Sequence, residues 1–177
     1  GHNFVCGRSG SRITYDNGKT DSSINSGGFL VKFNTSGDIV WSKMIPGYYN
    51  GGSYAMALDV KENIYISGKF DYFADFGGGI TMQRNYPNFY TAKYDSVGKI
   101  IWARHYGGAR KLFCRPSDAE GTYVYSLGKY HDPVRLSETV TLHRDSSYGS
   151  VIAKYYYNDT PDAEDISDKP WSIEKPE

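Results

Sequence analysis

Short runs of β-branched and aromatic residues, each bounded by Gly, Asn or Asp, recur along most of the chain. Clear examples lie at residues 64–66, 89–92 and 100–103. Runs of this length and composition are typical of β-strands, and turn-forming residues mark where each strand ends. No window of the repetitive part places apolar residues at helical spacing. The pattern therefore predicts an all-β fold.

The links between neighbouring strands share a common form. Residues 34–37 and 95–98 each begin with Asn or Asp and end with Gly. An Asn or Asp side chain can cap such a turn, and Gly can adopt positive φ, as in a type I turn followed by a G1 bulge. Residues 118–121 have the same form, and residues 59–63 are a longer variant. These links predict hairpins between antiparallel strands.

The chain repeats itself at a spacing of about 61 residues. Segments 28–41 and 89–102 align without gaps, and residues 151–155 begin a third copy. The recurring residues are lysines, tryptophans and strand-end glycines: Lys32, Lys93, Lys154, Trp41, Trp102, Gly7, Gly68 and Gly128. A binding site is normally singular, whereas a packing contact recurs in every repeat. We therefore interpret these residues as structural, with the tryptophans filling the space between neighbouring units.

Each complete repeat holds four strands. In the middle unit we expect strands at 55–60, 63–69, 89–94 and 99–105, with a long excursion between the second and the third. The first unit starts at its second strand, and the last unit stops after its third. The pattern thus predicts ten strands, which make two and a half units.

The repeat region spans residues 1–157, with units at about 1–53, 54–110 and 111–157. Residues 158–177 differ in composition, with seven acidic residues against two lysines and with three prolines. Short, acidic and proline-containing stretches behave as linkers or tails. We therefore predict one repeat region followed by a C-terminal tail or linker.

Composition narrows the classes of function. The 177 residues hold 20 Lys and Arg and 20 Asp and Glu, so the formal net charge is zero. Binding nucleic acid needs an excess of basic residues, so no nucleic-acid partner is expected. No apolar run approaches the ~20 residues of a membrane-spanning helix, so no membrane span is expected. Cys6 and Cys114 form neither a disulfide framework nor a zinc-type pair, and their oxidation state stays open.

Five landmarks of the middle unit follow one another in order, at residues 54–59, 63–70, 75–79, 90–95 and 98–104. Together they resemble the bacterial β-propeller repeats called SBBP repeats. The resemblance implies four-stranded antiparallel blades, a bacterial extracellular or cell-surface location, and a binding or scaffolding role without catalytic residues. The chain would then hold about two and a half to three blades of an incomplete propeller, since complete propellers have roughly 4–8.

Three arrangements would satisfy the open faces of an incomplete propeller. The chain could be a fragment of a longer propeller, or it could close by assembling with copies of itself or with another chain. The repeats could also form a different threefold β architecture, such as a trefoil. Open blade edges invite pairing with other strands in every case.

Residue types that carry catalysis or bind metals show no productive spacing. The histidines are scattered, at His2, His105, His131 and His143. No Gly-x-Ser-x-Gly motif occurs, and the glycine run at 77–79 lacks the Lys that follows a phosphate loop. We therefore predict no catalytic residue, no metal site and no cofactor.

Paired aromatic residues are the remaining candidates for a binding site. Tyr48 and Tyr49 precede the Gly- and Asn-rich residues 50–52 between two units, and Tyr72 and Phe73 begin the excursion of the middle unit. Tyrosine rings suit both sugar faces and protein surfaces. Our hypothesis is that these four residues, in exposed loops, line a contact surface for a glycan or a protein. Contact between blades is the alternative.

The leading expectation is a non-enzymatic, secreted or cell-surface binding or scaffolding module. Its partners would be other protein chains, the rest of a longer polypeptide, or a glycan. One alternative is a structural subunit of an extracellular filament, in which blade edges pair from chain to chain. Another is an accessory domain of a larger carbohydrate-active enzyme.

Overall fold

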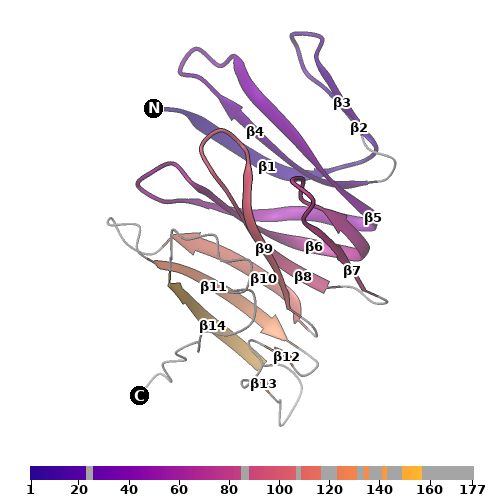
Figure 1. Ribbon diagram of the computed structural model, residues 1–177, viewed down its shortest axis with the longest axis vertical. Coiled ribbons are helices and arrows are strands. Elements are labelled where there is room, and N and C mark those ends of the chain that lie inside the picture. The colour runs from indigo at the N-terminus through magenta and orange to yellow at the C-terminus, as the bar shows by residue number, and fades with distance from the viewer. Residues whose placement is uncertain are drawn as a thin grey trace.

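The computed structural model describes residues 1–22, 26–84, 88–106, 109–116, 123–130, 134–135, 141–142 and 149–156, with side chains in 1–22, 26–47, 51–84 and 88–105. Every described element is a β-strand, and every described strand pair is antiparallel (Figure 1). The all-β prediction is confirmed. The strands are β1 (Asn3–Ser9), β2 (Arg12–Thr14), β3 (Thr20–Ser22), β4 (Gly27–Phe33), β5 (Ile39–Leu58), β6 (Ile64–Asp75), β7 (Thr81–Gln83), β8 (Asn88–Tyr94), β9 (Ile100–Tyr106), β10 (Ala109–Pro116), β11 (Tyr123–Tyr130), β12 (Val134–Arg135), β13 (Thr141–Leu142) and β14 (Gly149–Tyr156).

The strands form one large sheet, one three-stranded sheet and two small hairpins. The large sheet has the order β1-β4-β5-β6-β8-β9, with β7 beside β6. The three-stranded sheet has the order β10-β11-β14, and the hairpins are β2–β3 and β12–β13. Strand β10 lies beside β5, β6 and β8. In Figure 1 strands β1–β4 lie toward one end of the long axis and strands β10–β14 toward the other.

Strand β5 joins two parts of the large sheet. Its residues from Ile39 to Pro46 pair with β4, whereas those from Gly47 to Leu58 pair with β6. Register shifts between Gly47 and Ala55 interrupt the second ladder, and such bulges bend a strand. We therefore call β1, β4 and the first part of β5 unit 1. The rest of β5 with β6, β8 and β9 is unit 2, and β10, β11 and β14 are unit 3.

Equivalent residues keep the same register in successive units. A lysine of each unit pairs with an aromatic residue of the neighbouring strand, in the pairs Phe4–Lys32, Tyr65–Lys93 and Tyr125–Lys154. In units 1 and 2 the neighbour on the other side of this lysine is a tryptophan, Trp41 or Trp102. Residues about 61 positions apart in the sequence therefore occupy equivalent positions in successive units of the structure.

The excursion of each unit folds back as a small hairpin. Unit 1 carries β2–β3, unit 2 pairs the end of β6 with β7, and unit 3 carries β12–β13. In unit 2 the hairpin turn contains Gly77, Gly78 and Gly79, all at positive φ. The backbone N–H of Phe76 closes this turn on the carbonyl oxygen of Ile80 at 3.0 Å. The glycine run is a tight turn, as its composition predicts.

Units 1 and 2 share one hydrophobic core. Strand β8 lies in its middle and is buried along its whole length. The core side chains are Leu30 and Ile45 from unit 1 and Ile64, Ile66, Phe70, Ala74, Phe76, Tyr90, Ala92, Tyr94, Ile100 and Ala103 from unit 2. Phe4 and Trp41 pack against its margin. Because burial of apolar surface stabilises by roughly 25 cal/mol per Å², each unit stabilises the other.

Candidate functional site

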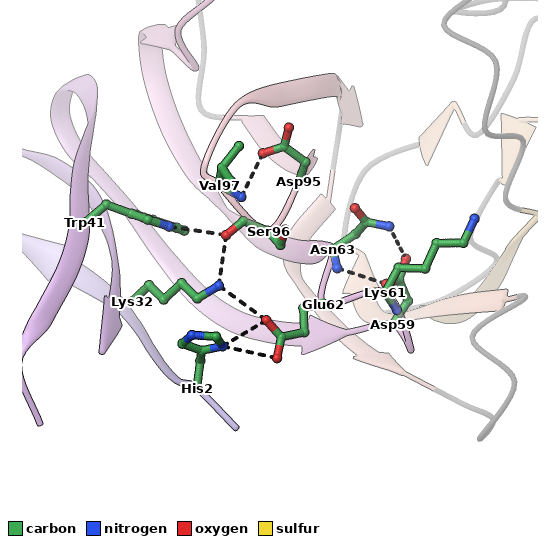
Figure 2. Close-up of polar contacts among 10 residues, drawn as sticks. All are labelled: His2, Lys32, Trp41, Asp59, Lys61, Glu62, Asn63, Asp95, Ser96 and Val97. Carbon is green, nitrogen blue, oxygen red and sulfur yellow. Dashed lines mark hydrogen bonds and ion pairs between the residues drawn. The ribbon is translucent and has the colours of Figure 1, made fainter. Parts of the chain in front are cut away.

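Side chains of unit 1 converge on a turn of unit 2. Lys32 Nζ donates to the carbonyl oxygen of Ser96 at 3.0 Å, and Trp41 Nε1 donates to the same oxygen at 3.3 Å (Figure 2). Lys43 Nζ donates to the carbonyl oxygen of Gly98 at 2.6 Å. Three donors of unit 1 therefore end on two carbonyl groups of unit 2.

The receiving turn is shaped by its own first residue. Asp95 Oδ1 accepts hydrogen bonds from the backbone N–H of Val97 at 3.1 Å and of Lys99 at 2.8 Å. The N–H of Gly98 donates to the Asp95 carbonyl at 3.0 Å, and Gly98 has a φ of +83°. The capped Asp-to-Gly turn expected from the sequence is thus present. The carbonyl groups of Ser96 and Gly98 take no part in these bonds and accept from unit 1.

Lys32 is the central donor of this contact. Its side chain is almost buried, and Nζ lies 3.2 Å from Glu62 Oε2. The same ammonium lies 5.2 Å from the centre of the Phe4 ring. A buried ammonium group is costly unless an anion and hydrogen-bond acceptors surround it. The carboxylate of Glu62 and the carbonyl of Ser96 supply both from unit 2.

The Glu62 carboxylate also contacts a second side chain of unit 1: His2 Nδ1 lies 3.1 Å from Glu62 Oε2. Hydrogen bonds from His2 and Lys32 lower the pKa of Glu62, since both favour the ionised carboxylate. Asp59 shapes the turn that carries Glu62 by accepting from the N–H of Asn63 at 2.8 Å and from its side-chain amide at 2.7 Å (Figure 2). The start of β1, the β5–β6 turn and the β8–β9 turn therefore meet at one point.

The equivalent lysine of unit 2 has a different ionic neighbour. Lys93 is fully buried, and its Nζ lies 5.1 Å from the centre of the Tyr65 ring and 3.9 Å from Asp59 Oδ2 of the same unit. Trp102 meets the Tyr65 ring edge-on, with a centroid distance of 6.1 Å. The cation–π contact thus recurs in both units while the anionic neighbour changes. The side chain of Lys154 lies outside the described residues.

Two of the three recurring glycines lie where neighbouring groups approach closely. A Cβ at Gly7 would lie 2.6 Å from the Phe29 ring. A Cβ at Gly68 would lie 2.0 Å from a backbone carbonyl oxygen of β5 and 2.6 Å from the Tyr90 hydroxyl. Both distances are shorter than real side-chain contacts, so only glycine fits without a shift. Gly128 pairs with β10 and β14 through its backbone, and its surroundings lie outside the described side chains.

The four candidate aromatic residues lie in strands. Tyr48 and Tyr49 belong to β5, and Tyr72 and Phe73 belong to β6. The expectation of loops is wrong, because β5 runs through the Gly- and Asn-rich segment after Tyr49, and Tyr48 and Gly52 at its two ends pair with β6 across a register shift. Tyr48 pairs with Asp71, so the register brings the two aromatic segments side by side. The side chains of Tyr48 and Tyr49 lie outside the described ones.

Tyr72 and Phe73 are consecutive strand residues that are both exposed, by 49% and 39%. Successive side chains of a regular strand point to opposite faces. Tyr72 breaks this alternation with a φ of +65°, a left-handed conformation that is rare for a residue with a side chain. Its carbonyl oxygen accepts a hydrogen bond from the N–H of Arg84 at 2.8 Å. Strained backbone of this kind often occurs at functional sites.

Charged residues of both signs precede or bond the backbone of this exposed aromatic pair. Lys69 Nζ lies 3.1 Å from Asp71 Oδ1, directly before Tyr72 in the chain. The guanidinium of Arg84 contacts the imidazole of His105. Burial, together with the charge of Arg84, lowers the pKa of His105. Exposed aromatic rings within a polar surrounding are typical of protein interfaces.

Sequence reasoning missed Lys43 and Glu62. Lys43 does carry a signal, because a basic residue, Arg104, stands 61 positions after it. Its Nζ lies 4.8 Å from the centre of the Tyr94 ring, and burial lowers the pKa of this lysine. Glu62 has no acidic counterpart 61 positions away on either side, so the repeat could not point to it.

Among the residues that the structure describes, no group of three or more His, Cys, Asp and Glu side chains is placed to hold a metal ion. The same part of the chain contains no helix that is long and apolar enough to cross a membrane.

Comparison with known proteins gives a distant similarity to a repeat protein. No family model matches the chain. Over 143 residues the chain is 23% identical to an uncharacterized WD repeat-containing protein of Acanthamoeba polyphaga mimivirus. The match covers 72% of this chain and 10% of that protein, so it spans about a tenth of the relative's length. The chain is thus distantly similar to a protein with WD repeats.

Proposed function

We propose that the chain forms successive blades of a β-propeller-type module that scaffolds protein partners. The contact of Lys32, Trp41 and Lys43 with the turn at residues 95–98 carries this proposal. Its lysines and tryptophan stand at positions where the repeat again places a basic residue or a tryptophan. In unit 1 these positions hold one unit against the next, as expected for a repeat scaffold in which each unit contacts its neighbours.

The strand order supports the propeller part of the proposal. Unit 2 is a four-stranded antiparallel meander, and β5 passes directly from the last strand of unit 1 to the first strand of unit 2. The relative's WD repeats point the same way, because WD40 repeats form four-stranded propeller blades. The bacterial extracellular location remains a prediction of the SBBP resemblance, and a fractionation experiment with the full-length protein tests it.

The exposed pair Tyr72 and Phe73 is the proposed contact surface for a protein. Tyr72 follows the Lys69–Asp71 ion pair directly in the chain, and its carbonyl oxygen accepts from the backbone N–H of Arg84, so charged residues of both signs lie near the aromatic pair. Aromatic residues are enriched in the centres of protein interfaces, and polar groups are enriched at their margins.

A photoreactive benzoylphenylalanine in place of Phe73 tests this surface. The matched control places the same residue at Val60, which is 65% exposed in the β5–β6 turn. In cells that produce the protein, we expect a discrete covalent adduct from position 73 and none from position 60. Tyr72→Ala in the same chain should reduce the adduct several-fold while leaving the thermal unfolding midpoint within about 2 °C.

Equal adducts from both positions would contradict a specific contact at Tyr72. A glycan-array signal that Tyr72→Ala removes, in the absence of a protein adduct, would assign the surface to a carbohydrate and contradict the protein partner.

A further inference from the structure

Units 1 and 2 carry the same turn between their last two strands. In unit 1, Asn34 Oδ1 accepts from the N–H of Ser36 at 2.9 Å and of Asp38 at 2.8 Å, and the N–H of Gly37 donates to the Asn34 carbonyl at 3.1 Å. Gly37 has a φ of +89°. These bonds reproduce those of the turn at residues 95–98, one repeat later.

Only the turn of unit 2, at residues 95–98, is covered by side chains of a neighbouring unit. A Cβ at Gly98 would lie 3.3 Å from two atoms of the Trp41 ring, whereas a Cβ at Gly37 would have nothing within 4 Å. The carbonyls of Ser96 and Gly98 accept from three side chains. Within the described part of the chain, no side chain donates to the equivalent carbonyls, those of Thr35 and Gly37.

Part of the apolar sheet face around the uncovered turn is open as well, although Val31, which pairs with Val5, is buried. Val5 stands 61 positions before Ile66, and Val5 is 46% exposed, whereas Ile66 is 0% exposed. Ile66 belongs to the core shared with unit 1. Phe33 and Ile39 are partly exposed, whereas Tyr94 and Ile100, one repeat later, are buried.

The outer edge of β1 is the third uncovered feature. Strand β6, one repeat later, pairs with β5 on one side and with β8 on the other. Among the described strands, β1 pairs with β4 alone. The edge therefore lacks the strand that the second part of β5 supplies to unit 2.

We propose that this face of unit 1 is a docking surface for a further repeat unit of the unit 1 type. That unit would place a tryptophan and two lysines, spaced as Lys32, Trp41 and Lys43 are, on the turn at residues 34–37. Its last strand would continue along the edge of β1, as β5 continues along β6. The proposal rests on the stacking of units within the proposed scaffold and is independent of the aromatic protein contact.

A second copy of this chain does not fit that description. Its unit 3 would have to supply the contact, and Lys154 stands at the position of Lys32 and Lys93. The positions one repeat after Gly98 and Trp102 hold Asp159 and Ala163 instead. The tryptophan that covers the turn is therefore missing from the far end of the chain.

An extended chain tests the proposal. A second copy of residues 1–63 is joined directly to residue 3 of the complete chain. This junction preserves the repeat spacing of 61 residues and places an added unit before unit 1. Val5→Lys in the complete part should lower the unfolding midpoint of the extended chain by about 5 °C or more, because the lysine would be buried as Ile66 is.

Two matched controls accompany this variant. Val5→Lys in the 177-residue chain, and Val5→Lys in the added copy, should each shift the midpoint by less than about 2 °C, since no unit covers these positions. Trp41→Ala in the added copy alone should lower the midpoint of the extended chain by about 2–4 °C or more.

Equal shifts for Val5→Lys in the extended and the 177-residue chain would overturn the proposal. So would an added unit that a protease digests as fast as an unfolded peptide, because the face would then have failed to order it. A dimer of the 177-residue chain that Val5→Lys dissociates would show that a second copy is the occupant, which also overturns it. Loss of the photo-adduct at Phe73 in any of these chains would bear on the proposed protein contact alone.

Discussion

Alanine in place of Gly98, compared with alanine in place of Gly37, isolates the contact between units 1 and 2. Both glycines have positive φ, so both substitutions carry the left-handed penalty of roughly 1–2 kcal/mol. Loss of glycine's freedom in the unfolded chain offsets about 0.4–1 kcal/mol of this penalty. Gly37→Ala should therefore cost about 1 kcal/mol. In Gly98→Ala the new methyl group also meets the Trp41 ring at 3.3 Å, and overpacking adds about 1–3 kcal/mol.

Urea denaturation followed by far-UV circular dichroism measures both free energies of unfolding. The difference between the two variants should be about 1–3 kcal/mol in the parent chain. In a Trp41→Ala background the two costs should agree within about 0.5 kcal/mol, because the group that the methyl meets is gone. Equal costs in the parent chain would refute the reasoning, as would a difference that survives the removal of Trp41.

Three further substitutions give independent checks. Glu62→Gln should flatten the pH dependence of the urea midpoint. The pKa of the Glu62 carboxyl is lowered below its ordinary 4.5, so the ionised group stabilises the fold above that pH and loses this effect as the pH falls through the lowered pKa. An unchanged pH profile of the urea midpoint would contradict this. The lowered pKa of His105 means that the fold favours the neutral ring and loses stability as the pH falls below 6.5. An NMR titration midpoint of the His105 ring at or above 6.5 would contradict the lowered pKa. His105→Gln should remove the loss of stability below pH 6.5. Tyr72→Gly should leave the unfolding free energy unchanged or raise it by up to about 1 kcal/mol, because glycine relieves the positive φ. A loss of more than about 1 kcal/mol in a urea titration would show that the side chain of Tyr72 stabilises the fold.

Local sequence signals account for the main strands and their capped turns, but the ten expected strands leave out the short hairpin strands β2, β3, β7, β12 and β13. Asp95 and Gly98 determine their turn through a side-chain cap and a positive φ, both of which act within a few residues. The strands of unit 2 likewise lie where short β-branched and aromatic runs predict them, although β6 continues to Asp75, well past the expected end at residue 69.

The contact between units was less predictable, because it depends on groups far apart in the chain. The repeat indicates that Trp41 packs somewhere, but neither its partner carbonyl at Ser96 nor the ionic partner Glu62 has a sequence signature. The same limit explains the error at residues 48–52. Local composition favours a loop there, whereas pairing with β6 at Tyr48 and Gly52, on either side of a register shift, makes the segment part of β5.

The passage of β5 through both units has a mechanical consequence. A pulling force applied at the N-terminus acts first on β1 and β4, and it then reaches unit 2 along the continuous strand β5, which is bonded to β4 on its first part and to β6 on its second. Detaching unit 1 as a whole therefore strains the ladder that begins unit 2. Under load the two should rupture together, as one event in a single-molecule trace.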